Sequence, residues 1–174
     1  LLTVTALAAA CPVLIAPAMD GGMFDHPATQ KNLETLQTRG VLVAGPAAGH
    51  LASGLSGVGR MLEPLEILGH IRVALGKSGK LAGKKVIVTA GGTQEAIDPV
   101  RVITNHSSGR QGYAVAQAAL DEGAEVTLVT TPTGLTPPVG AKVIHVKSAQ
   151  DMLESLMNES ADALVMAAAA ADFR

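Results

Sequence analysis

Residues 84–93 read Lys-Lys-Val-Ile-Val-Thr-Ala-Gly-Gly-Thr. The β-branched run Val86–Thr89 inside this stretch is typical of a strand that is buried on both faces of a parallel sheet. Helical apolar spacing follows over Gly109–Glu122, and a second apolar run follows over Val126–Thr130. Alternation of strand, helix and strand predicts an α/β fold, with a Rossmann-like parallel sheet in this part of the chain.

The same alternation continues toward the end of the chain. A strand is expected at Val143–Val146 and another at Ala163–Ala169. Between them, Ser148 followed three residues later by Asp151 is the pattern of a helix N-cap, and it predicts a helix over Met152–Met157.

The first part of the chain has its own α/β pattern, and a polar stretch separates it from the second part. The glycine-punctuated run Gly76–Gly83 has no periodicity, which favours domains at 1–76 and 84–174 with a linker at 77–83. Both outer ends fall inside apolar segments, so we expect each domain to be incomplete. The upstream elements are expected as a helix to about Ala9, strands Val13–Ala16 and Val41–Ala44, helices Pro27–Arg39 and Glu63–Leu75, and a glycine-rich loop Gly45–Met61.

Composition excludes several classes of function. Hydrophobic residues make up 48% of the chain and charged residues 16%, which is typical of a globular protein. A net charge of −2 and three aromatic residues give no basis for binding nucleic acid or an anionic membrane. The apolar run Leu1–Met19 contains Pro12 and Pro17 and lacks a basic start, which argues against a membrane span or a signal peptide. A single cysteine, Cys11, favours a reduced cytoplasmic protein with a buried thiol.

The connection between strand Val86–Thr89 and the next helix is unusually long, and long structureless connections are often functional. Gly91 and Gly92 would let the backbone approach a ligand just after the strand. Ser107, Ser108 and Gly109 come at the start of the helix, where free N–H groups attract anions. The residues alone leave two interpretations open, a phosphate site or an ordinary N-cap.

Two familiar nucleotide motifs are absent. The chain has no G-x-x-x-x-G-K-[ST] and no G-x-G-x-x-G motif. Strand Val126–Thr130 also ends in threonines instead of the acidic residue that holds the ribose of NAD. A P-loop enzyme and a dinucleotide dehydrogenase are therefore disfavoured.

Two longer motifs carry a specific resemblance. Residues 91–101 read Gly-Gly-Thr-Gln-Glu-Ala-Ile-Asp-Pro-Val-Arg, and residues 103–114 read Ile-Thr-Asn-His-Ser-Ser-Gly-Arg-Gln-Gly-Tyr-Ala. Together they resemble the signature of the phosphopantothenate–cysteine ligase domain of the bifunctional flavoproteins of coenzyme A biosynthesis. The run Ala167–Arg174 resembles the second motif of that family.

The resemblance implies a two-step ligation. CTP would activate the carboxylate of 4′-phosphopantothenate as an acyl-cytidylate, and the amine of cysteine would then form the amide. Asn105 matches the family asparagine associated with this intermediate, although an asparagine here could equally stabilise its loop. The resemblance implies nucleotide contacts from Gly91, Gly92, Ser107, Ser108, Gly109, Met166, Ala167, Ala168 and Asp172, with Mg²⁺ on the triphosphate and Asp172 as one candidate ligand.

Four neighbouring side chains have ordinary alternatives. His106 could be a general base or a polar loop residue. Glu95 and Asp98 could bind substrate, but Asp98-Pro99 is also a good turn former. Arg101 could pair with either acid or with a substrate phosphate, and this question stays open.

The first domain resembles the decarboxylase half of the same flavoproteins. Ala16–Phe24 reads Ala-Pro-Ala-Met-Asp-Gly-Gly-Met-Phe and resembles the family's Pro-Ala-Met-Asn-x-x-Met substrate motif, while Gly49–Met61 resembles its mobile flap. The resemblance implies a flavodoxin-like domain that uses FMN to decarboxylate phosphopantothenoylcysteine, in a protein that forms homo-oligomers. It assigns substrate contacts to Met19, Asp20, Met23, Ser53 and Arg60, although both methionines could simply pack against apolar neighbours.

Two residues depart from the family pattern. Asp20 stands where asparagine is usual, and Ser53 stands where many members have a cysteine that donates a proton. The family's first flavin-binding strand and its catalytic histidine would lie before Leu1. We therefore expect an enzymatic parent protein, and a 174-residue piece that is inactive or binds weakly by itself. The alternatives are a flavodoxin-like FMN-binding protein and a non-catalytic nucleotide-binding module.

Overall fold

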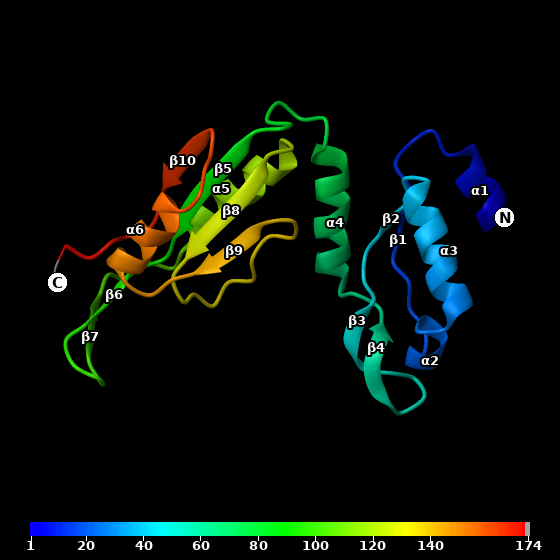
Figure 1. Cartoon of the computed structure of the whole chain (residues 1–174), viewed down its shortest axis with the longest axis horizontal. Helices are drawn as coiled ribbons and strands as arrows, with labels where there is room; N and C mark the ends of the chain where they lie inside the picture. Colours follow the sequence, from blue (N-terminus) through cyan, green and yellow to red (C-terminus); the bar gives the residue numbers. More distant parts are fainter. Residues whose placement is uncertain (173–174) are drawn as a thin grey trace. The chain divides into compact units, whose positions relative to one another are not determined.

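The computed structural model describes residues 1–172, and the chain divides into two compact units at Ala74 and Leu75. The second unit is built on a four-stranded parallel sheet with the order β10-β5-β8-β9 (Figure 1). Its strands are β5 (Lys85–Ala90), β8 (Glu125–Thr130), β9 (Lys142–His145) and β10 (Ala163–Met166). The predicted α/β fold with a parallel sheet is confirmed.

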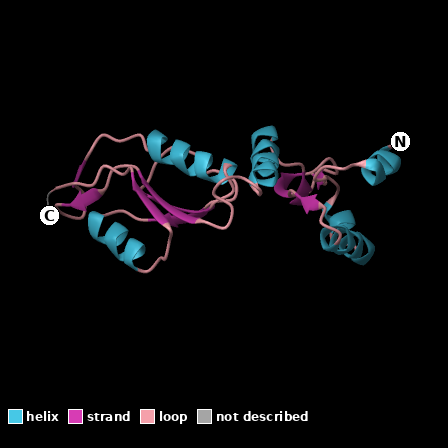
Figure 2. Cartoon of the chain, turned by 90° about the horizontal axis from the view of Figure 1, so that it is seen from above, coloured by secondary structure: helices cyan, strands magenta, loops and turns pink. Residues whose placement is uncertain are grey.

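Helices cover both faces of this sheet. Helix α5 (Arg110–Asp121) lies on one side and α6 (Ala149–Met157) on the other (Figure 2). Successive residues of β5 point to opposite faces, so Val86 and Val88 join the core under α5, while Ile87 joins the core under α6. This alternation is why the continuous run Val86–Thr89 contains no exposed position.

Strand β10 is shorter than the sequence predicts. The expected strand Ala163–Ala169 ends at Met166, because the next two N–H groups turn toward a side chain. The hydroxyl oxygen of Thr89 accepts from Ala167 N and Ala168 N, at 3.1 Å each. Parallel pairing resumes only as a single bridge between Gly92 and Ala169.

The long connection after β5 contains secondary structure that the sequence analysis did not predict. It forms an antiparallel hairpin of β6 (Gln94–Ala96) and β7 (Val102–Thr104), which extends away from the sheet (Figure 1). Asp98 shapes the turn by accepting from Val100 N at 2.9 Å and from Arg101 N at 2.7 Å. Arg101 Nε also donates to Asp98 at 2.6 Å, so Arg101 pairs with Asp98. These bonds, with that from Val100 N foremost, hold the pKa of Asp98 below its usual range.

Helix α6 begins as the sequence predicts. The hydroxyl of Ser148 accepts from Asp151 N at 3.0 Å, and the carboxylate of Asp151 accepts from Ser148 N at 3.0 Å. This reciprocal capping box satisfies two N–H groups at the helix start. The bond from Ser148 N is the main reason that the pKa of Asp151 is lowered.

The first unit consists of short elements. Strands β1 (Leu14–Ile15) and β2 (Leu42–Val43) pair in parallel, and β3 (Ala47–His50) pairs with β4 (Ser56–Arg60) as an antiparallel hairpin. The expected loop Gly45–Met61 is therefore partly wrong, because it contains this hairpin. The helices are α1 (Leu2–Ala8), α2 (Gly21–Phe24), α3 (Pro27–Thr38) and α4 (Pro64–Gly76), whose last two residues fall in the second unit.

Two expectations about the start of the chain can be compared with this unit. Cys11, expected to be buried, is exposed, because the segment between α1 and β1 packs against no core. None of the helices in residues 1–172 has the length and apolar character needed to cross a bilayer.

Candidate functional site

Two glycines mark the point where the chain leaves β5 at the carboxyl edge of the sheet. A Cβ atom on Gly91 would lie 2.0 Å from Thr131 Oγ1, and a Cβ atom on Gly92 would lie 2.5 Å from the carbonyl oxygen of Asn105. At Gly92 a side chain would require the backbone to shift, and at Gly91 it would require Thr131 to move and would be strained by the φ of 86°. Gly92 therefore brings the segment that carries Asn105 directly against the end of β5.

Asn105 follows β7 and lies beside the end of β10. Its Nδ2 donates to the carbonyl oxygen of Ala170 at 3.0 Å, two residues before Asp172. This bond stabilises the loop and leaves the second N–H of the amide without a partner among residues 1–172. Three segments that are far apart in sequence thus meet at one edge of the sheet, which is where ligands of parallel sheets bind.

The start of helix α5 belongs to the same cluster. Gly109 is its N-cap residue, with φ of 73°, and a Cβ atom there would lie 3.4 Å from Gly91 N. Ser107 Oγ accepts from Gly109 N at 3.4 Å and Ser108 Oγ accepts from Arg110 N at 3.5 Å, which are both long bonds.

The next two donors of this helix are free. Within residues 1–172 no group accepts from the backbone N–H of Gln111 or Gly112. Both belong to the first turn of α5, where the helix dipole places partial positive charge. The helix start therefore offers unsatisfied donors to an anion.

The end of β10 is held by buried threonines that the sequence analysis did not single out. Thr89 accepts from Ala167 N and Ala168 N, and Thr93 Oγ1 accepts from Ala171 N at 2.8 Å. Both threonines are fully buried. For Thr89 the available signal was a hydroxyl inside an otherwise apolar strand, since a buried polar group needs a partner.

The bonds to Thr89 determine which backbone groups at the end of β10 are left to bind a ligand. The N–H groups of Ala167 and Ala168 are already satisfied, so only carbonyl groups and the side chain of Met166, which is 58% exposed, remain available there. Asp172 is exposed. No cluster of three or more His, Cys, Asp or Glu occurs in the described part of the chain, so a metal at Asp172 would need ligands from the substrate.

The first unit has a cavity of about 380 Å³ under the β3–β4 hairpin, which we call the flap cavity. It contains four of the five residues assigned to the decarboxylase substrate, namely Met19, Asp20, Ser53 and Arg60. The fifth, Met23, lies on α2 with its side chain 61% exposed and does not line this cavity. The complete lining is Ala18, Met19, Asp20, His50, Leu51, Ala52, Ser53, Gly59, Arg60 and Met61.

The two residues that depart from the family pattern contact each other in this cavity. Ser53 Oγ donates to Asp20 Oδ2 at 2.5 Å, and Gly22 N donates to Asp20 Oδ1 at 3.1 Å at the start of α2. The bond from Ser53, followed by that from Gly22, lowers the pKa of Asp20. Nothing in the separation of 33 residues between Asp20 and Ser53 indicated this pair in the sequence.

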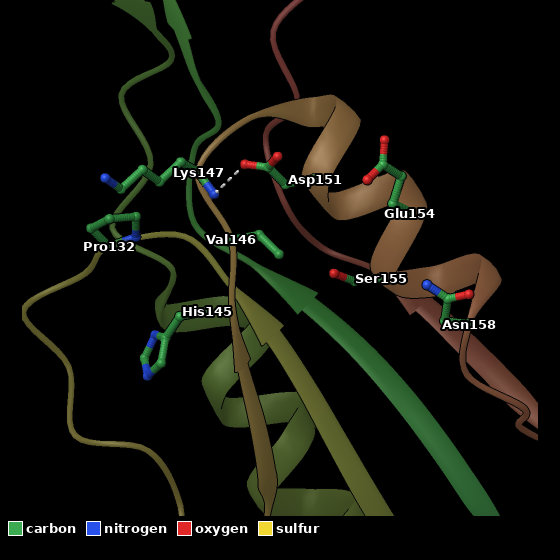
Figure 3. Close-up of a pocket in the computed structure, with 8 residues that line it drawn as sticks. All are labelled: Pro132, His145, Val146, Lys147, Asp151, Glu154, Ser155 and Asn158. Atoms are coloured by element: carbon green, nitrogen blue, oxygen red, sulfur yellow. Dashed lines mark hydrogen bonds between the residues drawn. The ribbon is translucent and has the colours of Figure 1, made fainter.

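Another cavity, of about 510 Å³, opens at the carboxyl ends of β8 and β9 (Figure 3). Its polar walls are largely explained by local structure, because Asp151 belongs to the capping box and Glu154 accepts from Gln150 at 2.9 Å. The side chain of Lys147 extends away from Asp151, toward Pro132, and only its backbone N–H contacts the carboxylate (Figure 3). We assign no ligand to this cavity.

Comparison with known proteins identifies relatives of both units. A family model described as "DNA/pantothenate metabolism flavoprotein C-terminal domain" matches residues 81–174, and one described as "Flavoprotein" matches residues 1–76. The "Coenzyme A biosynthesis bifunctional protein CoaBC" of Mycobacterium tuberculosis strain H37Rv is 51% identical over 181 residues, which cover 100% of this chain and 43% of the relative. Its counterpart from Vibrio cholerae is 50% identical over 176 residues, which cover 100% of this chain and 44% of the relative.

A solved structure agrees with these matches. The crystal structure of the C-terminal domain of a coenzyme A biosynthesis bifunctional protein CoaBC superposes with a TM-score of 0.51 at 50% identity, covering 53% of this chain and 48% of that one. This chain thus spans less than half the length of the relatives it matches. Because the matching residues 81–174 make up more than half of it, the chain belongs to the DNA/pantothenate metabolism flavoprotein family.

Proposed function

We propose that this chain is part of an enzyme of coenzyme A biosynthesis, and that its second unit carries part of a CTP-dependent phosphopantothenate–cysteine ligase site. One observation supports this most directly. Gly92, Asn105 and Ala170 come from three separate segments, yet direct contacts join them at the carboxyl edge of the sheet. These segments are the ones in which the two ligase-like motifs lie.

The start of helix α5 has the groups needed to bind the triphosphate of the nucleotide. The free N–H groups of Gln111 and Gly112 and the positive end of the helix dipole would face the phosphates. The hydroxyls of Ser107 and Ser108 make only long bonds, so they can turn toward phosphate oxygens at little cost. Gly91 and Gly109 would allow the nucleotide to approach the backbone, because neither carries a side chain.

The side-chain amide of Asn105 has one N–H group that makes no bond within residues 1–172 and is available for the reaction. Its bond to the carbonyl of Ala170 fixes the orientation of the amide, and its second N–H is left for a substrate. During activation and amide formation, negative charge develops on the oxygen of the reacting carboxyl carbon. A preorganised donor at that position stabilises the transition state more than the ground state.

A magnesium ion fits this arrangement without a protein cage. Mg²⁺ in phosphoryl-transfer sites is commonly held by one or two carboxylates together with substrate phosphates and water. Asp172, which is exposed and lies two residues after the Ala170 that accepts from Asn105, would supply such a carboxylate. The ion would offset the charge on the phosphates during loss of pyrophosphate.

For the first unit we propose the substrate side of a phosphopantothenoylcysteine decarboxylase, at the flap cavity. Met19, Asp20, Ser53 and Arg60 line it together. FMN, when bound, would supply the oxidation of the substrate thiol that makes decarboxylation possible. These four residues that line the flap cavity are ones that the resemblance assigns to the substrate, so this cavity is proposed for the substrate alone.

The test uses a full-length protein that carries this chain. Asn105→Ala should lower the rate of phosphopantothenoylcysteine formation by about 100- to 1,000-fold, as for loss of one oxyanion donor. CTP affinity, measured by calorimetry, should stay within about threefold, because the triphosphate contacts lie at α5. Asn32→Ala, at an exposed position on α3, is the matched control and should leave both quantities unchanged.

Tighter binding of ATP or NAD than of CTP would contradict the ligase proposal. Nucleotide binding by an unmodified full-length protein that forms no amide would favour the non-catalytic module instead. Absorbance in the flavin band together with no CTP binding would favour a flavodoxin-like FMN-binding protein.

A further inference from the structure

The flap cavity has an unusual distribution of donors and acceptors. Its charged or titratable residues are Asp20 after β1, His50 on β3 and Arg60 on β4. Both oxygens of Asp20 are already occupied, one by Gly22 N and the other by the hydroxyl of Ser53. Both carboxylate oxygens of Asp20 are therefore engaged with protein groups, which fixes the orientation of the carboxylate.

The bond between Ser53 and Asp20 also determines whether Ser53 can donate to a ligand or accept from it. A serine hydroxyl has one proton and two lone pairs. Because that proton points to Asp20 Oδ2 at 2.5 Å, only lone pairs of Ser53 Oγ are left for the cavity. A carboxylate cannot act as a donor, so the pair cannot reverse this polarity while Asp20 is ionised.

Close packing holds the segment that carries Asp20 against the β3–β4 hairpin that carries Ser53. Met19 N donates to the carbonyl of Gly59 at 2.9 Å, and a Cβ atom on Gly59 would lie 2.1 Å from the carbonyl oxygen of Met19. The side chain of Leu51 fills the space beside Gly21 and Gly59, at 3.8 and 3.3 Å from the Cβ positions. The hairpin therefore lies directly on the segment that carries Asp20.

Arg60 supplies the opposite kind of contact. Arg60 lines the cavity and donates to Glu63, and a guanidinium has five N–H donors, so others are left for a ligand. His50 is held by Ser56, whose Oγ lies 3.0 Å from His50 Nδ1. The cavity thus has a cationic donor at Arg60 and a neutral acceptor at Ser53.

We propose that Asp20 is a positioning residue that fixes Ser53 as a hydrogen-bond acceptor, so that the flap cavity selects a ligand with a thiol S–H or amide N–H at Ser53 and an anionic group at Arg60. The inference rests on the proposed role of this cavity as a substrate site.

Asp20→Asn gives the inference a sharp consequence. The oxygen of the new amide can still accept from Gly22 N, which turns its NH₂ group toward Ser53. That NH₂ would donate to Ser53 Oγ and release the serine proton into the cavity. The substitution should therefore change Ser53 from an acceptor into a donor, with almost no change of volume.

The first measurement is ligand preference in the full-length protein. The probes are 4′-phosphopantetheine, which has a thiol donor, and its S-methyl thioether, which has none. The unmodified protein should bind the thiol about two- to tenfold more tightly, the worth of one neutral hydrogen bond. Asp20→Asn and Ser53→Ala should each reduce this preference to about one, and the double variant should match Ser53→Ala. Asp25→Asn, at the exposed end of α2, is the control and should keep the preference.

The second measurement is carbon NMR of the Asp20 carboxyl as a function of pH, in the 174-residue chain. Ser53→Ala should raise the pKa of Asp20, since the bond from Ser53 is the main cause of its lowering. A preference for the thiol that survives Ser53→Ala would overturn the inference, and so would an unchanged pKa of Asp20. Failure of the unmodified protein to bind either probe would instead overturn the proposed substrate site itself.

Discussion

The two units share one alternation of strands and helices, yet they bury their apolar residues very differently. In residues 75–172, β5 and β8 have six residues each and contribute fully buried side chains such as Val88 and Leu128. In residues 1–74, β1 and β2 have two residues each, and Ala44 is the only buried apolar residue. A pattern of elements therefore predicts the fold class of a segment without predicting how much core it has.

Because the two units differ in buried core, different kinds of contact hold the two candidate sites in place. The ligase-like site rests on two fully buried threonines, Thr89 within strand β5 and Thr93 just after it. The flap cavity rests on close glycine contacts and on one exposed pair, Asp20 and Ser53. We expect the first site to depend on the stability of its unit, and the second to depend on a few local bonds.

The largest effect is expected where the core is deepest. Leu128→Ala should lower the free energy of unfolding of the second unit by about 2–5 kcal/mol, because Leu128 is fully buried and the removed atoms leave a cavity. Urea unfolding, with hydrogen exchange of the amides in β5 and β8, would measure this loss.

Leu65→Ala on α4 is the matched change in the first unit. Leu65 is 80% exposed, so its replacement should alter unfolding by at most about 0.5 kcal/mol. If Leu128→Ala and Leu65→Ala lowered the free energy of unfolding by similar amounts, both units would depend equally on apolar packing, and the contrast between them would be wrong.

A smaller effect is expected at the buried hydroxyl under the ligase-like site. Thr89→Val keeps the shape of the side chain but leaves the N–H groups of Ala167 and Ala168 without an acceptor. We expect a loss of about 1–3 kcal/mol in unfolding free energy. CTP affinity of the full-length protein should also fall, because the end of β10 is no longer held.

Thr127→Val on β8 provides the control for this change. Thr127 is half-buried, and its hydroxyl has no hydrogen-bond partner among residues 1–172, so the same substitution should cost about 0.5 kcal/mol or less. Unchanged CTP affinity in Thr89→Val would show that the nucleotide does not depend on the end of β10.

Local patterns predicted the elements of the second unit because its long strands and helices carry strong periodicity. Strand β5, helix α5 and the capping box at Ser148 and Asp151 all occur within a residue or two of the expected positions. The motifs also directed attention to Gly92 and Asn105, which the structure brings into contact.

The remaining features depend on contacts that no local pattern records. The hairpins β3–β4 and β6–β7 consist of strands of three to five residues, too short to show an alternation. The end of β10 is set by Thr89, which lies 78 residues away from Ala167. The pair of Asp20 and Ser53 likewise depends on how the β3–β4 hairpin folds back.

The smallest effect concerns the capping box, and it tests whether local bonds behave alike in the two units. Ser148→Ala should lower the free energy of unfolding of the second unit by about 1 kcal/mol, the usual loss for a helix N-cap. Because the pKa of Asp151 is lowered, the unfolded chain binds more protons than the native state as the pH falls through the carboxyl range. The contribution of Asp151 is therefore present at neutral pH and is lost as the pH falls through its lowered pKa.

Urea midpoints measured between pH 7 and the acid limit of folding would follow this contribution. The difference between Ser148→Ala and the unmodified chain should shrink as Asp151 becomes protonated, because the Ser148 side chain helps to lower the pKa of Asp151 and this part of its contribution is lost on protonation. Ser160→Ala, at an exposed serine outside the helix, is the control and should show no such trend. A difference that stays constant with pH would mean that the hydroxyl cap acts independently of the carboxylate, unlike the coupling inferred for Ser53 and Asp20.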